Sequence, residues 1–411
     1  MAQQEFHVVV FGATSFVGQI MAKYLLGRHG ANGELKWAIA GRSKGKLEEL
    51  RGSLGAQAAS LPVIVADAAD EAALRAMVQR TRAVASTVGP YALYGTPLVK
   101  VCAELGTDYL DLAGEVQWIA RMVDTHEAAA KKSGARIVHC SGFDSIPSDL
   151  GTYFTQQQSR QQHGKPSQRV KCRVRTLKGG PSGGTAASLI NAVRESVADP
   201  AVRKLMGNPF ALCPDRGAGR PRQPNVAFAE YDEDAKSWLG PFVMAAINTR
   251  IVHRSNFLSG DAYGKDFVYD EAMMTGQGPG GFMRASAIAG ALGGFIGLVV
   301  FPPTRRLVEK YVVPQPGEGP SPEAQERGRF DLRFFGKTAD GKTVMTKVTG
   351  DRDPGYGSTA KMLGEAAACL ALDVSKSDKA GGFWTPATAL GDKLLARLAQ
   401  HAGLTFEALL N

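Results

Sequence analysis

The sequence predicts an α/β protein that begins with a doubly wound parallel sheet and continues into an α+β domain with a mixed or antiparallel sheet. Its 411 residues exceed what one ordinary hydrophobic core accommodates, so we expect two domains. As far as about residue 150, strand-length apolar runs alternate with helical patterns, but from about Arg169 this alternation ends. We therefore predict a first domain over 1–150, a second over 151–375, and C-terminal helices over 376–411 that pack on either domain, including a return to the first.

The first domain contains six strand candidates, each followed by a turn signal. The run FHVVVF (6–11) is apolar throughout, as expected for a strand that is buried on both faces. The segment after it has helical spacing, so that Phe16, Ile20 and Tyr24 share a face. Further helices are expected over 70–81 and 95–106. The other strand candidates are LKWAIAG (35–41), PVIVAD (62–67), RAVASTVG (82–89), DYLDLAG (108–114) and ARIVHCSG (135–142).

The second half of the chain has a different pattern. QRVKCRVRTL (168–177) alternates like a strand with an exposed basic face, and the glycine-rich run at 178–195 opens a helix. The two alternating runs joined by ADG within 329–350 predict a β-hairpin. The segments 199–241 and 314–326 are rich in proline and glycine and are expected to be loops.

The composition limits the classes of partner. A hydrophobic content of 44% and a charged content of 21% are typical of folded, water-soluble proteins. The net charge of +9 favours an anionic partner, such as a phosphorylated cofactor, an acidic carrier protein or a membrane surface. The basic residues are dispersed and no basic motif has interleaved aromatics, so we expect no nucleic-acid partner. The composition does not predict an oligomeric state.

The five cysteines and the N-terminus suggest a location in the cell. The cysteines lie far apart, with neither metal-ligand spacing nor a disulfide framework, so we expect a reducing compartment and no metal site. The chain enters its first strand without a basic segment and an apolar segment ahead of it, so we expect no secretory signal. A cytoplasmic location follows, with peripheral attachment to the inner face of the plasma membrane as an additional hypothesis.

That hypothesis rests on the apolar stretch Ala285–Phe301. The stretch is shorter than the roughly 20 residues that span a bilayer and contains several glycines, so the favoured expectation is a buried helix of the second domain. The alternative is an element that docks on a membrane or lines a tunnel for an acyl chain. The flanking Arg284, Arg305 and Arg306 suit anionic headgroups.

The first strand leads into a candidate phosphate-binding turn, GATSFVG (12–18). Such a site needs a tight turn, close backbone approach and a helix N-terminus directed at the anion. Gly12 supplies the turn and Gly18 the close contact between helix and strand, while Thr14 and Ser15 offer hydroxyl and N–H groups. Ser15 stands where the middle glycine of such turns is expected. On its own the spacing is weak evidence, because a plain strand–turn–helix shares it.

The end of the second strand indicates which dinucleotide would bind. A ribose 2′-hydroxyl is usually met there by an acid, and a 2′-phosphate by arginine. This chain has no acid at that place and offers Arg42 and Ser43, which predicts NADP over NAD. Asp67, at the third strand end, is placed to meet the adenine. The fourth strand end, with Thr87, Gly89 and Pro90, would border the nicotinamide.

Catalytic candidates follow the later strands, where open α/β sheets bind ligands. A reductase needs a proton donor beside the cofactor, and Tyr91 and Asp144 are our preferred candidates. Each candidate also has a structural interpretation, because aromatic rings pack on helices and strand-end acids cap them. His126 and His139 are expected to be structural. The remaining polar candidates are Tyr94, Asp111, Glu115, Ser145 and Asp149.

Four motifs in order resemble the saccharopine dehydrogenase-like oxidoreductases: VVVFGATSFVG, AGRSKGKL, TVGPYALYGTPLVKVCAELGTDYLDLAGE and HCSGFDSIPSDLG. The likeness is closest to the branch with the bacterial trans-acting enoyl reductases, and Ser15 departs from the glycine of many relatives. The resemblance implies a Rossmann domain, a substrate domain and NADP(H)-linked reduction. The cofactor positions that it implies are Gly12, Thr14, Ser15, Phe16, Val17, Gly18, Arg42, Ser43, Asp67, Thr87, Gly89 and Pro90.

The motifs are specific for the family and not for the substrate. The apolar stretch favours reduction of a C=C bond in an acyl, lipid-like or polyketide-derived substrate, linked to lipid or glycolipid synthesis, and the charge suits an acidic acyl carrier. The enzymatic alternative is a saccharopine dehydrogenase-type amino-acid oxidoreductase that forms or cleaves a secondary amine. A hypothesis of another class is a non-catalytic NADP-binding or lipid-surface protein.

Overall fold

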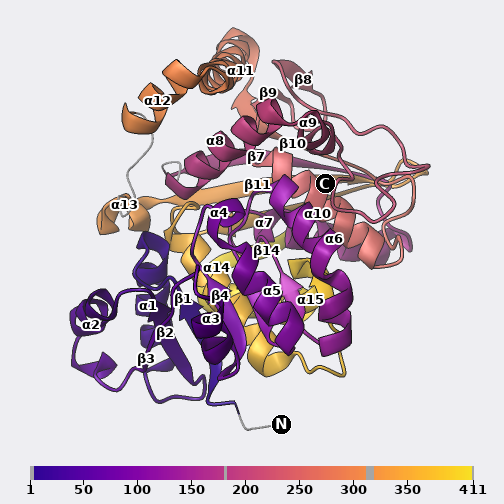
Figure 1. Cartoon of the computed structure of the whole chain (residues 1–411). Helices are drawn as coiled ribbons and strands as arrows, with labels where there is room; N and C mark the ends of the chain where they lie inside the picture. Colours follow the sequence, from indigo (N-terminus) through magenta and orange to yellow (C-terminus); the bar gives the residue numbers. More distant parts are fainter. Residues whose placement is uncertain (1–3, 180–182, 312–318, 410–411) are drawn as a thin grey trace.

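The computed structural model describes residues 4–179, 183–311 and 319–409. In this part of the chain two seven-stranded sheets form, with helices around both (Figure 1). The first sheet is parallel and the second is mixed, which confirms the predicted fold class. The domain boundaries near 150 and 375 stay predictions.

The first sheet has the strand order β13-β6-β5-β4-β1-β2-β3, and all of its pairs are parallel. Its strands are β1 (Phe6–Phe11), β2 (Trp37–Gly41), β3 (Val63–Val65), β4 (Thr81–Ser86), β5 (Asp108–Asp111), β6 (Arg136–Val138) and β13 (Gly382–Trp384). The helices beside it are α1 (Phe16–His29), α2 (Lys44–Ser53), α3 (Glu71–Val78), α4 (Tyr91–Tyr94), α5 (Thr96–Leu105), α6 (Val116–Ser133), α14 (Gly357–Ala368) and α15 (Pro386–Arg397). A short 3₁₀ helix lies at Ala56–Ala58, and short π-helices lie at Cys369–Asp373 and Leu398–Ala402.

The apolar run of β1 places this strand inside the sheet, between β2 and β4. Val8, Val9 and Val10 are fully buried because helices cover both faces. Side chains of α1, α2, α14 and α15 share one hydrophobic cluster, and those of α3, α5 and α6 share the other. The carboxyl ends of β1 to β6 therefore meet at one edge of the sheet, where all the predicted site residues of this domain follow their strands.

The second sheet has the order β14-β12-β11-β7-β10-β9-β8, in which only the β7–β10 pair is parallel among the described pairs. Its strands are β7 (Arg169–Lys178), β8 (Glu230–Asp232), β9 (Ser237–Pro241), β10 (Val268–Gly276), β11 (Arg329–Lys337), β12 (Thr343–Gly350) and β14 (Leu404–Leu409). The helices of this half are α7 (Ile146–His163), α8 (Gly183–Ala198), α9 (Pro200–Met206), α10 (Ala245–Leu258), α11 (Gly278–Val300), α12 (Pro302–Tyr311) and α13 (Pro322–Arg327).

The predicted hairpin is confirmed, whereas two predicted loops contain regular structure. β11 and β12 pair antiparallel from Phe330 opposite Gly350 to Lys337 opposite Thr343. The expected loop at 199–241 includes α9, β8 and β9. Part of 314–326 lies outside the described residues, but its end forms α13, whose first turn is capped by the Ser321 hydroxyl. Short caps of this kind are easily missed in a proline-rich sequence.

The C-terminal part of the chain contacts both sheets. After α14, which packs on α1, the chain adds β13 to the first sheet beside β6, and it ends as β14 paired with β12 in the second. Buried Arg136 of β6 holds the segment between α14 and β13 against the first sheet. Its guanidinium pairs with Asp108 and donates to the carbonyls of Leu370 (2.9 Å) and Val374 (2.7 Å). The last residues therefore complete both sheets.

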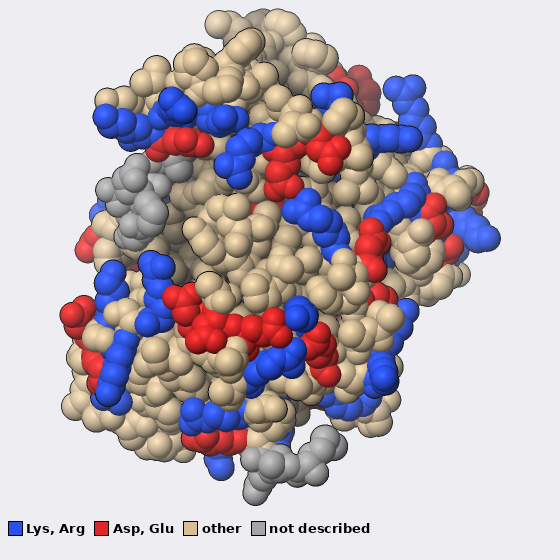
Figure 2. Space-filling view, in the orientation of Figure 1, with Lys and Arg blue, Asp and Glu red and all other residues tan. Residues whose placement is uncertain are grey.

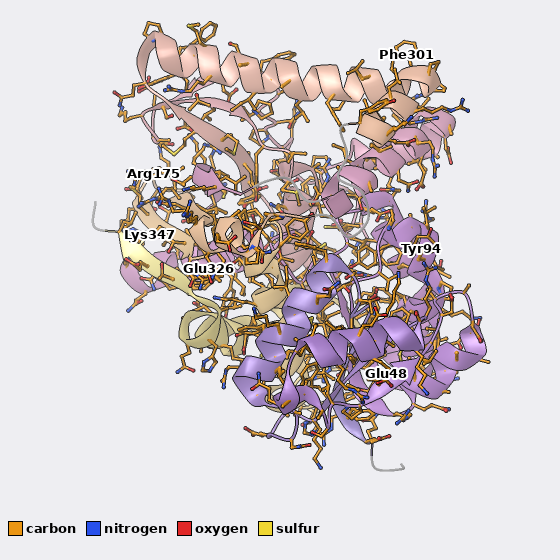
Figure 3. The ribbon with its side chains drawn as sticks, turned by 90° about the vertical axis from the view of Figure 1, so that its left-hand side faces the viewer. Glu48, Tyr94, Arg175, Phe301, Glu326 and Lys347 are labelled. Atoms are coloured by element: carbon orange, nitrogen blue, oxygen red, sulfur yellow. The ribbon has the colours of Figure 1, made fainter. Side chains whose placement is uncertain are left out.

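The favoured expectation for Ala285–Phe301 is wrong. The stretch belongs to α11, a 23-residue helix in whose most apolar 18-residue stretch only 11% of the residues are buried. In the side view α11 runs along one edge of the molecule with Phe301 at its end, and α12 follows it (Figure 3). The apolar composition suggested a core helix. In the structure one face of α11 contacts β9 and β10 of the second sheet, and the rest of the helix faces outward.

Candidate active site

The turn after β1 is shaped so that a side chain does not fit at its first position. Gly12 has a φ of +83°, and a Cβ there would lie 2.6 Å from Val88 Cγ2 and 2.9 Å from Thr87 Oγ1. A Cβ on Gly18 would lie 2.4 Å from the carbonyl oxygen of Gly12. These contacts produce the tight turn and the close helix–strand approach that the sequence predicts. They direct the N-terminus of α1 toward the carboxyl edge of the sheet.

Ser15, the departure from the glycine pattern, is the N-cap of α1. Its Oγ accepts a hydrogen bond from the N–H of Gly18 (3.0 Å) and lies 2.9 Å from the Thr87 hydroxyl. Thr87 in turn donates to the carbonyl oxygen of Gly12 (2.9 Å). The serine therefore stabilises the helix start and joins it to the end of β4, which a glycine at this position would not do.

Removing this cap is expected to cost stability in a way that depends on the replacement. Ser15→Ala should lower the free energy of unfolding by about 1 kcal/mol, because alanine leaves the first-turn N–H without its acceptor. Ser15→Gly should lower it by only a few tenths of a kcal/mol. Chemical denaturation of the two variants and the parent protein measures the difference. Equal losses for alanine and glycine would contradict the capping role.

The end of β2 is basic and exposed, as predicted. Arg42 is exposed, and Ser43 caps α2 by accepting from the N–H of Lys46 (3.4 Å). Asp67 follows β3, where its Oδ1 accepts from the N–H of Ala69 (2.9 Å) and shapes the local turn. No acidic residue directly follows β2, so the positive charge there is available for a phosphate.

The turn after β4 lies against the glycine turn of β1. The N–H of Thr87 donates to the carbonyl oxygen of Phe11 (2.9 Å), and its hydroxyl reaches Gly12 as described above. Gly89 is exposed and Pro90 half-buried. The two turns thus form one continuous rim, which is where the sequence places the nicotinamide end of the cofactor.

Residues of the second domain meet this rim from the other side. Phe16 packs edge-on against Tyr356 with ring centroids 4.7 Å apart, and the Tyr356 hydroxyl accepts from the N–H of Gly183 at the start of α8 (2.9 Å). Thr14 and Val17 are half-buried beside Phe16. Nothing in the sequence marks Tyr356, because it lies in a loop far along the chain and belongs to no local motif.

The glycine turn, the open N-terminus of α1 and the exposed arginine fit an NADP dinucleotide. Gly12 leaves the space that a Cβ would fill, which allows a pyrophosphate to approach the backbone. Arg42 and Ser43 are the residues that would hold the 2′-phosphate. The direct contacts of the individual residues with the cofactor stay predictions.

Tyr91 has a hydroxyl that is fully engaged with the backbone. It donates to the carbonyl oxygen of Ser86 (2.9 Å) and accepts from the N–H of Leu112 (3.1 Å), and the side chain is only 4% exposed. Burial raises the pKa of this hydroxyl well above its usual range, with a further contribution from Asp111. These contacts join the ends of β4 and β5, so the geometry favours a positioning role. Its predicted catalytic role is untested.

Glu115 caps a helix, but not the one that follows it in the chain. Its carboxylate accepts from the N–H groups of Tyr91 (2.7 Å) and Ala92 (3.1 Å) at the start of α4, and from the Ser188 hydroxyl of α8 (3.0 Å). Burial raises its pKa. Glu115 therefore connects the turn after β4 to the second domain, a role that the sequence did not show.

Asp144 is the acid whose surroundings suit proton transfer. The residue is half-buried, yet its Oδ2 atom is buried and has no hydrogen-bond partner in the described part of the chain. Burial, followed by the nearby charge of Asp111, raises its pKa to about 8. With this pKa the carboxyl is mostly protonated at neutral pH and can act as a proton donor.

Asp111, whose charge acts on Asp144, is itself held by an ion pair and backbone hydrogen bonds. Its Oδ2 lies 2.7 Å from Nδ1 of His139, and its Oδ1 accepts from the N–H groups of Ala113 (3.1 Å) and Cys140 (3.2 Å). His139 is buried against the rings of Tyr109, Trp118 and Phe383. The contact between Asp111 and His139 connects the ends of β5 and β6, which agrees with the structural role expected for His139.

The other candidates after β6 have structural contacts. Asp149 accepts from the Ser255 hydroxyl and from the N–H of Ala387 (2.8 Å), which ties α7 to α10 and α15. Ser145 donates to Asn248 (2.9 Å) inside the second domain. His126 lies on α6, away from these strand ends. In the glycine-rich run at 178–195, residues 180–182 lie outside the described part, and the rest begins α8.

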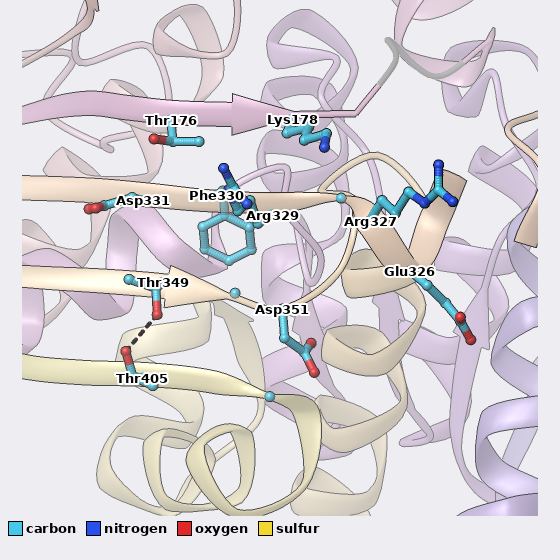
Figure 4. A pocket seen from close by; sticks show the side chains of 13 residues that line it. Thr176, Lys178, Glu326, Arg327, Arg329, Phe330, Asp331, Thr349, Asp351 and Thr405 are labelled. Atoms are coloured by element: carbon cyan, nitrogen blue, oxygen red, sulfur yellow. Dashed lines mark hydrogen bonds between the residues drawn. The ribbon is translucent and has the colours of Figure 1, made fainter. Parts of the chain in front are cut away.

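A pocket of about 640 Å³ lies elsewhere, on the second sheet (Figure 4). It is lined by side chains of β7, β11, β12 and β14, among them Lys178, Asp331 and the hydrogen-bonded pair Thr349 and Thr405 (2.7 Å). None of the predicted cofactor or catalytic residues lines it. We therefore assign the candidate active site to the strand ends of the first sheet and not to this pocket.

The parallel sheet, its glycine turn and the basic end of β2 define a Rossmann-type, NADP-dependent oxidoreductase. The family model described as the saccharopine dehydrogenase NADP-binding domain matches residues 8–138. The chain belongs to the saccharopine dehydrogenase-like oxidoreductases, in the branch that contains the trans-acting enoyl reductases.

The relatives cover almost the whole chain. A trans-acting enoyl reductase of Mycobacterium tuberculosis is 40% identical over 409 residues, covering 97% of this chain and 96% of that protein. One of Mycobacterium ulcerans is 38% identical over 408 residues, covering 97% of each. The solved structure of apo saccharopine dehydrogenase (L-Glu forming) from Saccharomyces cerevisiae has the same fold, with a TM-score of 0.55, 14% identity and coverage of 98% of this chain and 100% of that one.

Proposed function

We propose that the protein is an NADPH-dependent enoyl reductase that reduces the C=C bond of an acyl, lipid-like or polyketide-derived substrate. The observation that carries this proposal is Asp144, which follows β6 at the edge of the sheet that carries the cofactor turn. Its pKa is raised to about 8, and its buried Oδ2 atom has no hydrogen-bond partner in the described part of the chain. Reduction of an activated C=C bond needs one proton at the carbon that receives no hydride. The names of the relatives support the same reaction.

When bound, NADPH supplies the hydride. The chain's own residues supply a proton and a fixed geometry. Asp144 holds the proton on its carboxyl, because burial and the charge of Asp111 disfavour ionisation. Glu115 and Tyr91 hold the turns after β4 and β5 through backbone N–H groups, so the groups around the reacting bond are positioned before substrate enters.

An acidic acyl carrier protein is the partner that we propose to present the substrate. The net charge of +9 favours association with an acidic protein. A role in lipid or glycolipid synthesis belongs to the same proposal.

Ion pairs in the second sheet weaken the alternative function, a saccharopine dehydrogenase-type amino-acid oxidoreductase. A substrate with several carboxylates needs arginines that are free to pair with it. The sequence suggested an exposed basic face on β7, but Arg173 is buried and paired with Asp232 (2.8 Å) and Asp270 (2.6 Å). Lys171 also pairs with Asp232 (3.2 Å). Lys171 and Arg173 are therefore not free to pair with a substrate. Arg169 and Arg175 of the same strand are exposed and lie farther from their acids, at 3.7 Å from Asp270 and 3.8 Å from Asp331.

A substrate panel tests the proposal. Purified protein is mixed with enoyl thioesters and NADPH, or with saccharopine and NADP⁺. Absorbance follows the oxidation of NADPH in the first mixture and the reduction of NADP⁺ in the second. We expect turnover with the enoyl thioesters only. Turnover with saccharopine alone supports the amino-acid alternative, and binding of NADPH without any turnover supports a non-catalytic protein.

A further inference from the structure

One side of α11 and α12 exposes large apolar side chains. Met283 is 69% exposed and Phe301 is 64% exposed, fractions that are unusual for such residues in a folded domain. In the space-filling view the top of the molecule, over α11, shows neither Lys, Arg, Asp nor Glu (Figure 2). We call this surface the apolar ridge; its large exposed side chains are Phe282, Met283, Ile296, Leu298, Phe301, Leu307 and Tyr311.

The charges around the apolar ridge are mainly basic, with the exposed Glu309 of α12 as the acid among them. From Gln277 to Val308 the sequence contains no Asp or Glu. Arg284 lies near the start of α11, and Arg305 and Arg306 follow its end. In Figure 2 a band of Lys and Arg side chains lies below the apolar surface, on the side where α12 runs. An uncharged centre with basic edges matches the headgroup region of an anionic membrane.

The opposite side of α11 is fixed to the protein. Gly281, Ala285 and Val299 are buried, and the first two lie against β9 and β10. A Cβ on Gly240 of β9 would lie 3.3 Å from the carbonyl oxygen of Ala285, so the helix backbone packs closely on that strand. Val299 shares a cluster with Val308 of α12 and with α8. Both ends of α11 are therefore held on the same side of the molecule.

This attachment determines how the helix can meet a bilayer. With 23 residues α11 is long enough, by length and composition, to cross a membrane. Crossing would place its two ends on opposite sides of the bilayer, which the contacts of Ala285 and Val299 with the same domain do not allow. A helix held in this way lies in the plane of the surface with its outward face in the lipid.

The centre of the outward face consists of small residues. A Cβ on Gly290, Gly293, Gly294 or Gly297 would meet no atom of the described protein within 4 Å. Glycine within a helix costs roughly 0.5–1 kcal/mol relative to alanine, so packing within the chain does not explain them. A second copy would also fit such a face, but it would bring together the four basic residues of α11 and α12 from each chain, with Glu309 as the one acid of these two helices to pair with them. Charge therefore favours lipid.

We propose that α11 and α12 dock on an anionic lipid surface, with the axis of α11 in the membrane plane. This interaction is separate from the reaction proposed above, and it would bring the enzyme to the compartment where a lipid-like product partitions. It does not need the active site, so soluble substrates should be turned over without membrane.

Vesicle sedimentation tests the docking. The full-length protein is mixed with vesicles of phosphatidylcholine alone or with added phosphatidylglycerol. We expect binding to the anionic vesicles that weakens as salt is raised. The double variant Met283→Ser/Phe301→Ser should bind at least about tenfold more weakly, because two large apolar side chains no longer enter the lipid. Leu105→Ser, which changes an exposed leucine of the first domain, should bind like the parent protein.

A second variant keeps the test decisive if the first does not fold. Arg305→Glu/Arg306→Glu leaves the apolar side chains in place and should reduce binding to anionic vesicles. Circular dichroism and NADPH binding establish that each variant is folded. Absence of binding by the parent protein overturns the proposal, as does unchanged binding by both folded variants. A dimer in light scattering that Met283→Ser/Phe301→Ser dissociates overturns it in favour of a second copy.

Discussion

Asp144→Asn is expected to lower kcat for an enoyl substrate by about 10²- to 10⁴-fold, the range contributed by general acids. The amide has nearly the same shape as the carboxyl but has no acidic proton to give. NADPH binding should be unchanged, because the residue follows β6 whereas the phosphate turn follows β1. Steady-state kinetics and a fluorescence titration with NADPH measure the two effects separately.

The pH dependence gives an independent check on Asp144. Its pKa is raised to about 8 by burial and by Asp111, so kcat should fall as the pH rises through 8 and the proton is lost. The same shift affects stability. Because the folded protein holds this proton over a range where the unfolded chain has lost it, the contribution of Asp144 to stability decreases from the ordinary pKa of an aspartate up to about pH 8.

Asp149→Asn is the matched control. Asp149 is also a buried acid with a raised pKa, about 7, but its carboxylate contacts α10 and α15. The variant should be less stable and should keep the alkaline decrease in kcat. If Asp144→Asn retains most of the parent kcat, or if the alkaline decrease persists in it, another group donates the proton.

Arg42→Ala is expected to weaken NADPH binding by about 10- to 100-fold and to leave NADH binding unchanged. A hydrogen bond to a charged group contributes roughly 1.5–3 kcal/mol, and only NADPH carries the 2′-phosphate that Arg42 is placed to meet. Fluorescence titration with both dinucleotides measures the ratio. The effect is a change of specificity and not a general loss, because Arg42 is exposed and supports no other part of the fold that the structure describes.

Lys36→Ala controls for the change in net charge. Lys36 is exposed and precedes β2, so it lies at the opposite end of the same strand. It should leave the preference for NADPH intact. Equal affinity of the parent protein for NADPH and NADH, or an unchanged NADPH affinity in Arg42→Ala, would contradict the predicted 2′-phosphate site.

The first domain could be predicted because its signals are local. A buried parallel strand such as Phe6–Phe11 is apolar at every position, and the turn after it requires glycine at Gly12. The basic end of β2 was also visible in the sequence. The preference for Tyr91 and Asp144 as catalytic residues stays a prediction, and the structure adds only that the buried Oδ2 atom of Asp144 has no hydrogen-bond partner among the described residues.

The parts that could not be predicted depend on contacts between distant segments. Gly382–Trp384 is too short to read as a strand until β6 is beside it, and Tyr356 reaches Phe16 only through the fold. The hydroxyl of Tyr91 looked available, but the backbone at Leu112 and Ser86 uses it. Apolar composition alone did not decide whether α11 is buried, because burial depends on how much of the second sheet remains to be covered.

The path of the C-terminal segment has a consequence for synthesis. The edge strand of the first sheet, Gly382–Trp384, and the edge strand of the second, Leu404–Leu409, are synthesised after all the other described strands of their sheets. Until then the edge of β6 and that of β12 are unpaired, and exposed strand edges promote aggregation. We therefore expect that both domains mature together once this segment has been made, and that its deletion reduces the yield of folded protein more than changes ahead of Phe6–Phe11.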